Sequence, residues 1–173
     1  RGMTLREHTI LSNSAYRLDV AMARVCIAQH DFNTALDWLS RAEKAYQQTA
    51  EPDIYPIASL RARIWIRQGR ISDVNRWLNE QGLLADDDLH FSLEFDHITV
   101  VRLRLAQFVR DQDDEALQEV LDLIDRLLQA AAEGGRKTRV IELYVLQSLA
   151  HHASMDTQTA VNVLQRALEI AEP

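Results

Sequence analysis

The sequence has little of what a disulfide-stapled, turn-rich or membrane-spanning protein needs. It holds one cysteine, five glycines and three prolines in 173 residues. A single thiol excludes an internal disulfide framework and suits a reducing compartment, so we expect a cytoplasmic protein. Turn-rich β architectures need more Gly and Pro, and the composition therefore favours helices. No apolar run approaches the roughly 20 residues of a membrane span, so we expect neither a membrane span nor a secretory signal peptide.

Clustered positive charge is also missing. Asp and Glu outnumber Lys and Arg by 26 to 19, which gives a formal net charge of -7. A surface that binds DNA or RNA gathers Lys and Arg against the phosphates, whereas the basic residues here are interleaved with acids. We therefore expect no direct nucleic-acid binding by this chain. A negative surface favours protein or small-molecule partners.

A nine-residue phrase returns twice at a spacing of 39 residues. Its copies read ARVCIAQHD at 23–31, ARIWIRQGR at 62–70 and VRLRLAQFV at 101–109. Self-similarity at a fixed period of this size indicates a repeat architecture, because one repeat alone cannot bury its apolar face and must stack on a neighbour. Three columns stand in register, and the most polar of them is Arg24, Arg63 and Arg102.

Apolar residues recur at helical spacing along almost the whole chain. They predict a single helical-repeat domain over residues 1–173 with four helical hairpins at about 13–49, 54–81, 89–133 and 137–172. The predicted helices are 13–29, 32–49, 54–68, 71–81, 89–110, 113–133, 137–153 and 156–171.

The second helices of the hairpins also repeat one another. Ala35 and Leu39 of the first hairpin return as Val74 and Leu78 in the second. In the last hairpin Ala160, Val163, Leu164 and Ala167 stand at the places of Ala35, Trp38, Leu39 and Ala42. Small residues at this column suit the close approach of two helices, and the bulky ones suit the gap between neighbouring hairpins.

These patterns predict an all-α, tetratricopeptide-like superhelix, an α-solenoid of about four helical hairpins. The period is near 40 residues rather than the 34 of a standard tetratricopeptide repeat, so we expect longer helices. A non-repetitive helical bundle is the alternative.

Sequence signatures of catalysis are missing as well. The chain has no G-x-x-x-x-G-K-[ST], H-E-x-x-H, C-x-x-C or G-x-S-x-G motif. Cys26 lies in an apolar helix stripe, where a small buried thiol is the ordinary interpretation. No pair of acid–base groups is set side by side by spacing. We therefore expect a binding protein rather than an enzyme.

One helix face has the spacing of metal ligands. His90, Glu94 and His97 stand at i, i+4 and i+7, and the last two form a Glu-x-x-His step. Di-iron bundles use two such steps and two further Glu residues, but only one step is present here. We therefore interpret this face as solvated or hydrogen-bonded and expect no metal site. A helical metalloenzyme remains the hypothesis that this face alone would support.

The arginine column has two interpretations. In the structural one, each arginine pairs with an acid of its own or the next hairpin, such as Asp19, Glu94 or Asp96. In the functional one, the arginines form a positive track for an anionic ligand or peptide, which suits the rigid guanidinium fork.

A ligand-binding groove would also draw on residues beside this column. Glu142 stands in an apolar stretch and should have a partner, Arg139 or an arginine of the neighbouring repeat. Aromatic side chains on the first helices are mostly core, although some would line a concave surface. The predicted groove residues are Arg63, Trp65, Glu94, His97, Arg102 and Tyr144.

Several phrases resemble those of one known family. They are LRARIWIRQGRISDVNRWLNEQGL, LHFSLEFDHITVVRLRLAQ, EGGRKTRVIELYVLQSLAHHA and AVNVLQRALEIAEP, in that order. The succession resembles the tetratricopeptide-like sensor region of the large ATP-binding LuxR-type transcriptional regulators, the MalT-like family. The resemblance runs from about Leu18 to Pro173, and its most specific parts are residues 91–99 and 135–150.

The resemblance implies a larger protein. Family members carry an ATP-binding module upstream and a LuxR-type helix-turn-helix downstream, so this chain would be a fragment with no cofactor of its own. ATP would bind the upstream module and DNA the downstream one. The sensor region of the family responds to a small-molecule inducer or a regulatory protein, and the regulators self-associate, so we also expect a homo-oligomer. A generic tetratricopeptide-like scaffold that grips a partner protein is the alternative.

Overall fold

In the computed structural model, the structure describes residues 2–46, 56–83 and 91–172, with the backbone alone for residues 2–14 and Phe91. Within these ranges it has eight α-helices, one short 3-10 helix at Phe91–Leu93 and no strand, so the predicted all-α class is confirmed. None of the described helices combines the length and apolar character needed to cross a bilayer. The helices are α1 (Gly2–Ala28), α2 (Phe32–Tyr46), α3 (Ile57–Arg67), α4 (Ile71–Gln81), α5 (Glu94–Asp111), α6 (Asp114–Glu133), α7 (Lys137–Ala153) and α8 (Thr157–Ala171).

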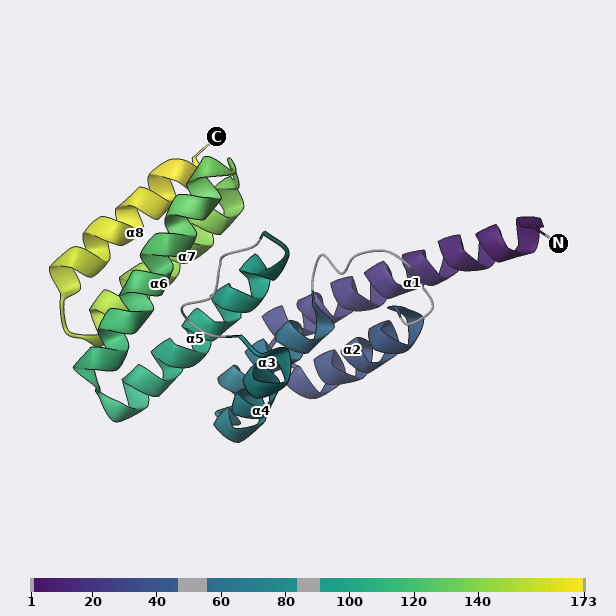
Figure 1. The fold of residues 1–173 in the computed structure, drawn as a ribbon, viewed down its shortest axis with the longest axis horizontal. Helices are drawn as coiled ribbons and strands as arrows, with labels where there is room; N and C mark the ends of the chain where they lie inside the picture. Colours follow the sequence, from purple (N-terminus) through teal and green to yellow (C-terminus); the bar gives the residue numbers. More distant parts are fainter. Residues whose placement is uncertain (1, 47–55, 84–90, 173) are drawn as a thin grey trace. The chain divides into compact units, whose positions relative to one another are not determined.

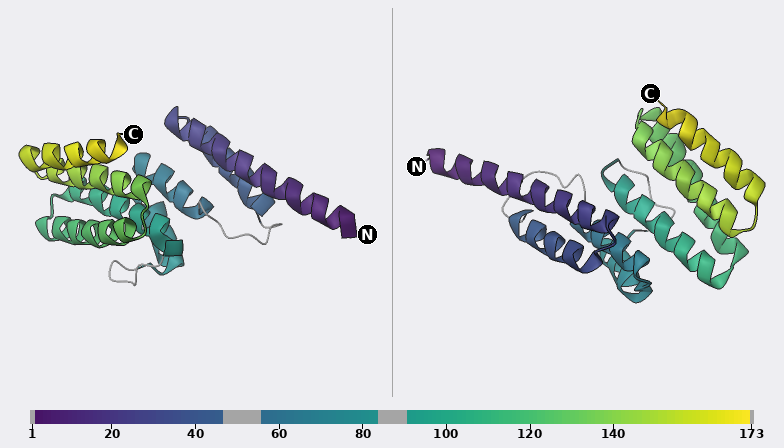
Figure 2. Two further views of the ribbon diagram at one scale, coloured as in Figure 1. Left: turned by 90° about the horizontal axis from the view of Figure 1, so that it is seen from above. Right: turned by 180° about the vertical axis from the view of Figure 1, so that it is seen from behind.

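The chain divides into two compact units, Arg1–Gly69 and Arg70–Pro173. In the first unit, α1 and α2 form an antiparallel hairpin and α3 packs against α2 (Figures 1 and 2). Asp31 caps α2, because its carboxylate accepts a hydrogen bond from the Thr34 N–H at 3.2 Å. The guanidinium of Arg67 in α3 donates to the Ile27 carbonyl at 3.3 Å and ties α3 to the end of α1.

The second unit is a row of stacked helices. Helix α4 contacts α5, and from α5 onward each helix contacts the next one along the chain (Figure 1). The first helices of consecutive hairpins, α5 and α7, also contact each other. This is the packing predicted from the repeat, in which a hairpin buries its apolar face against its neighbour.

Helix α6 shows how the sequence produces this packing. Its apolar residues recur at i, i+3, i+4, i+7 and i+11 and form one stripe. The structure buries that whole stripe, and polar residues such as Glu119 and Asp122 lie off it. Asp113 caps the helix and accepts a hydrogen bond from the Glu115 N–H at 3.1 Å. The buried residues are Val120, Leu123, Ile124, Leu127 and Ala131.

Each turn between the two helices of a predicted hairpin passes through a residue with left-handed backbone. These residues are His30, Gly69, Gln112 and Met155, with φ between 54° and 70°. Gly69 follows His30 by 39 residues, but Gln112 lies four residues later than the same spacing would place it. Four residues are about one helical turn, so the first helix of the third hairpin is longer by a turn. The 39-residue register of the repeat is therefore broken within the third predicted hairpin.

Helix boundaries agree with prediction where the turn chemistry is strong. The predicted bounds 71–81 and 137–153 coincide with α4 and α7. The start of the first helix was predicted wrongly, because α1 begins at Gly2 instead of residue 13. Residues 2–12 contain no proline, and extending an existing helix adds one hydrogen bond per residue fixed. The predicted boundaries at 49, 54 and 89 lie outside the described residues.

Candidate functional site

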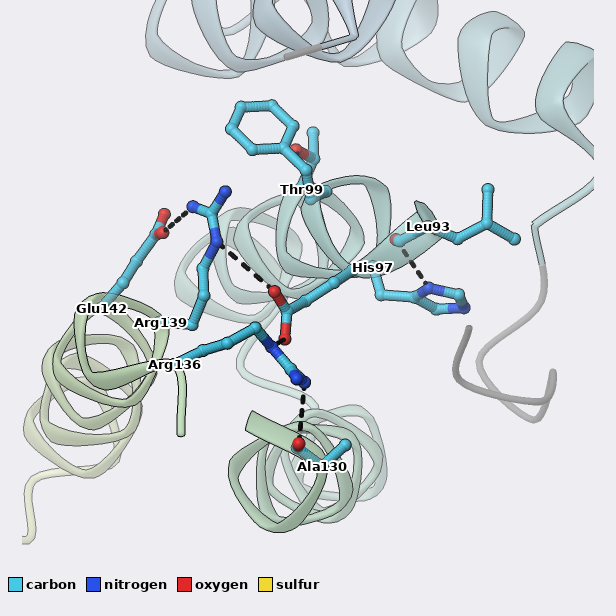
Figure 3. A network of polar contacts seen from close by, with 9 residues as sticks. Leu93, His97, Thr99, Ala130, Arg136, Arg139 and Glu142 are labelled. Atoms are coloured by element: carbon cyan, nitrogen blue, oxygen red, sulfur yellow. Dashed lines mark hydrogen bonds and ion pairs between the residues drawn. The ribbon is translucent and has the colours of Figure 1, made fainter. Parts of the chain in front are cut away.

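Glu94, the first residue of α5, accepts two ion pairs from the beginning of α7. Its carboxylate lies 2.8 Å from Arg136 Nε and 3.5 Å from Arg139 Nε. Figure 3 shows both arginine side chains reaching from α7 toward α5. Glu94 is buried, and a buried carboxylate needs such partners because leaving water costs several kcal/mol.

Arg136 extends the contact to α6. Its Nη2 donates to the Ala130 carbonyl at 2.7 Å, near the end of that helix (Figure 3). The two glycines before Arg136 have different structural roles. Gly135 has left-handed backbone, at φ +65°. Gly134 has ordinary backbone, but a Cβ built there would overlap the Arg136 guanidinium. The Gly-Gly pair therefore both turns the chain and leaves room for the ion pair.

Glu142 joins the same network one turn farther along α7. It accepts hydrogen bonds from Arg139 Nη1 at 3.0 Å and from Arg102 Nη2 of α5 at 2.9 Å. The predicted partner was Arg139 or an arginine of a neighbouring repeat, and the structure has both. Arg139 also lies with its guanidinium carbon 5.3 Å from the Phe95 ring centroid, a favourable cation–π contact.

The network consists of three guanidinium groups and two carboxylates, and it fastens the third hairpin to the fourth. Arginine stays protonated at neutral pH, so these pairs are not arranged for general acid–base work. Their physical effect is to fix α5, α7 and the end of α6 at one separation. We call the five residues Glu94, Arg102, Arg136, Arg139 and Glu142 the inter-hairpin network.

His97 is fully buried one turn after Glu94. Its Nδ1 lies 2.9 Å from the Leu93 carbonyl (Figure 3). A carbonyl can only accept a hydrogen bond, so Nδ1 is the donor in this contact. Within the described residues, Nε2 has no hydrogen-bond partner.

The helix face with metal-ligand spacing consists of His90, Glu94 and His97, and the structure describes the last two of these residues. His90 lies outside the described residues. Both carboxylate oxygens of Glu94 are engaged by arginine, and Nδ1 of His97 is engaged by the backbone. Over the parts of the chain that the structure describes, no group of three or more His, Cys, Asp or Glu residues could hold a metal ion.

The other predicted groove residues are distributed over both units. Arg63 and Trp65 lie on α3 in the first unit, and Tyr144 lies on α7 in the second; all three are half-buried. Of the six, Glu94 and Arg102 are brought into the inter-hairpin network. A groove lined by the whole set stays a prediction.

The arginines of the repeated column have different surroundings in different hairpins. Arg102 pairs with Glu142 of the next hairpin, rather than with the Glu94 or Asp96 that the sequence suggested. Asp19, the third suggested acid, lies 3.4 Å from Arg41 of α2, whose guanidinium also stacks over Trp38. Arg24 is exposed on α1. Cys26 is a buried free thiol, as expected.

Arg136 is the network member that sequence reasoning missed. It follows Gly134-Gly135, and residues of that kind signal only a turn. A usable signal is the spacing of Arg136, Arg139 and Glu142 at i, i+3 and i+6, which places the three near one side of a helix. No spacing rule connects them to Glu94, which lies about forty residues earlier.

Comparison with known proteins identifies the family of this chain. The sequence model of the family described as the MalT-like TPR region matches residues 1–173, the whole chain. Comparison with curated proteins and with solved structures gave no match. The match and the stacked helices together confirm the predicted tetratricopeptide-like helical solenoid class.

Proposed function

The chain belongs to the family of MalT-like TPR regions, and from this premise we propose that it is the sensor and self-association domain of a MalT-like, LuxR-type transcriptional activator. The domain binds an inducer or a regulatory protein on its helical-repeat surface. The observation that carries the proposal is the family match over the entire chain, which agrees with the resemblance of the motif phrases.

The packing supplies a physical route for such sensing. Stacked hairpins contact mainly their neighbours, so a ligand that changes the spacing of two hairpins biases the next pair. An effector shifts the population of two arrangements only by its difference in affinity for them. The inter-hairpin network holds α5 and α7 in one arrangement by three ion pairs, and an effector that favours another separation works against those pairs.

Half-buried side chains on the first helices are the proposed contacts for the effector. Arg63 and Trp65 of α3 offer a cationic fork and an aromatic surface, which suit an anionic ligand with an apolar part. Tyr144 of α7 is a separate candidate contact in the second unit. Arg102 is partly exposed but already pairs with Glu142.

The test is a thermal-shift screen of small anionic metabolites on the purified chain, followed by calorimetric titration of each hit. Arg63→Glu should weaken binding of a hit at least about tenfold with little change in melting temperature. Arg76→Glu is the matched control, since Arg76 is largely exposed on α4. A large loss of stability in Arg63→Glu with unchanged affinity would assign Arg63 to the structure of α3 instead.

The surrounding reading frame separates this proposal from a generic scaffold. A Walker motif encoded upstream and a helix-turn-helix encoded downstream support the regulator. Their absence, together with capture of a short peptide by the purified chain, would support the scaffold.

A further inference from the structure

The ion pair between Arg102 of α5 and Glu142 of α7 leaves one donor of the guanidinium unused. Glu142 Oε1 accepts a hydrogen bond from Arg102 Nη2 at 2.9 Å. Arg102 Nε stands next to Nη2 on the same edge of the guanidinium, and this buried atom has no hydrogen-bond partner within the described residues. A carboxylate in the most favourable geometry accepts from two N–H groups of an arginine in parallel. Glu142 therefore takes only half of the contact that this edge of Arg102 offers.

A second arginine holds Glu142 in this incomplete geometry. Its other oxygen, Oε2, accepts from Arg139 Nη1 at 3.0 Å, one turn earlier on α7 (Figure 3). With one oxygen on each arginine, the carboxylate cannot present both oxygens to Arg102. The geometry also shows that a carboxylate fits between guanidinium groups of two different helices.

Solvent reaches this end of the inter-hairpin network. The side chains of Arg102 and Glu142 are 31% and 18% exposed, whereas the side chain of Glu94 is 8% exposed. An ion pair that keeps contact with water contributes little to stability, because water competes for both charges. A competing anion therefore displaces Glu142 from Arg102 at a lower cost than it would displace Glu94 from its arginines.

The charge of the network favours an added anion. Its three guanidinium groups and two carboxylates carry one net positive charge. A free carboxylate would balance that charge, and it is not constrained by attachment to α7. It can therefore turn both oxygens toward Nε and Nη2 of Arg102, which Glu142 does not do.

We propose that Arg102, with Arg139 beside it, is a binding site for the carboxylate of a small organic acid, and that Glu142 occupies this site as a tethered competitor. The ligand carboxylate accepts from Nε and Nη2 of Arg102, and Glu142 turns toward solvent. The exchange removes the Arg102–Glu142 link between α5 and α7. The two ion pairs of Glu94 stay in place.

This inference rests on the proposed sensor function and names a ligand class for it. The α5–α7 contact loses one of its three ion pairs when the ligand binds, so the ligand favours a looser arrangement of the two hairpins. A side chain attached to the site competes at a high effective concentration. The unchanged chain should therefore respond only to an acid that gains further contacts, and removal of Glu142 should open the site to simple acids.

The test uses acetate as the probe and the whole chain with Glu142→Ala. Thermal shift is measured over increasing sodium acetate, with sodium chloride holding the ionic strength constant. Acetate should raise the melting temperature of Glu142→Ala along a saturating curve, with an apparent Kd at least about tenfold lower than that of the unchanged chain. Acetamide, which has the same shape without the charge, should produce no such curve.

Three further variants show whether the response comes from the guanidinium fork. Glu142→Ala with Arg102→Gln should lose the acetate response. Glu142→Ala with Arg102→Lys keeps the charge without the fork, so its response should be clearly weaker than that of Glu142→Ala alone. Glu119→Ala is the matched control, because Glu119 is exposed on α6 outside the network, and it should respond as the unchanged chain does. Circular dichroism checks that all variants are helical.

Two results would overturn the inference. One is an equal acetate response with and without Arg102 in the Glu142→Ala background, which would mean general stabilisation by the salt. The other is an apparent Kd for Glu142→Ala no lower than that of the unchanged chain. An effector whose affinity depends on Arg63 but not on Arg102 would support the sensor function without this site. An acetate site in a chain that binds no effector would support the site without the sensor function.

Discussion

The guanidinium of Arg136 fills the space into which a side chain at Gly134 would project. That guanidinium donates to Glu94 of α5 and to the Ala130 carbonyl of α6. The backbone of Gly134 is ordinary, at φ -81°, so the obstacle to a larger residue there is the neighbouring Arg136 side chain and not the backbone conformation. This relationship joins a turn in the sequence to the packing of two hairpins.

Gly134→Ala should lower the free energy of unfolding by about 1–2 kcal/mol, because the new Cβ displaces Arg136 from Glu94. Urea denaturation measures the loss. The control is the same change in an Arg136→Ala background, where alanine meets no guanidinium and should be neutral or slightly stabilising. An equal loss in both backgrounds would mean that Arg136 is not what Gly134 accommodates.

The two carboxylates of the inter-hairpin network should differ in their contribution to stability. Glu94→Gln should cost about 3 kcal/mol, since it leaves two arginines facing a neutral group at a buried position. Glu142→Gln should cost about 1 kcal/mol, because Glu142 and its partner Arg102 retain contact with water. Denaturation of both variants tests this order, with Glu119→Gln on the exposed side of α6 as the control. Similar losses for both network carboxylates would contradict it.

At one of the left-handed turn residues, a substitution should stabilise the chain instead of destabilising it. Met155→Gly should raise the free energy of unfolding by about 1 kcal/mol, because glycine adopts φ +66° without a Cβ clash and the methionine side chain is exposed. Gly69→Ala should lower it by a similar amount, although a Cβ there would meet nothing within 4 Å. Met155→Ala keeps the backbone strain and is the control. If Met155→Ala stabilised the chain as much as Met155→Gly does, the gain would come from loss of the exposed methionine side chain and not from relief of backbone strain.

Stability below neutral pH should depend on the cap of α8. Hydrogen bonds from Thr159, first from its side chain and then from its backbone N–H, lower the pKa of Asp156 from its ordinary 3.8. A carboxyl whose pKa is lowered by folding stabilises the fold above the ordinary pKa and loses that effect as pH falls through the lowered value. Asp156→Asn keeps a side chain that can cap α8 but removes the titrating carboxyl. The thermal stability of this variant should therefore fall less between pH 5 and pH 2 than that of the unchanged chain. Parallel pH profiles for the two proteins would contradict this.

The sequence predicted a great deal of the second unit. The bounds of α4 and α7 follow from local signals, namely helical apolar spacing and glycine at the turns. The small-residue column was also informative, because Ala35, Val74 and Ala160 are all buried. The need of Glu142 for a partner followed from its apolar neighbours. Each of these properties depends on residues within a few positions of one another.

The sequence repeat identified equivalent positions, but only the structure showed which of them are buried. Leu39 and Leu164 are the same residue at the same repeat position, yet one is buried and the other is exposed. Periodicity identifies a face that is suited to packing, but the burial of that face depends on whether another helix lies against it. The sequence therefore indicated the apolar stripe of α8 without showing which of its residues stay exposed.

By itself, the sequence determined that this protein is all-α and built from repeated helices, because backbone hydrogen bonding and apolar periodicity are local and return with every repeat. Only the tertiary structure decided which arginine meets which carboxylate. Arg102 and Glu142, like Glu94 and Arg136, lie about forty residues apart, and their meeting depends on how α5 and α7 stack. A buried charge takes whichever partner the packing of the helices brings within reach, and no spacing along the chain specifies that partner.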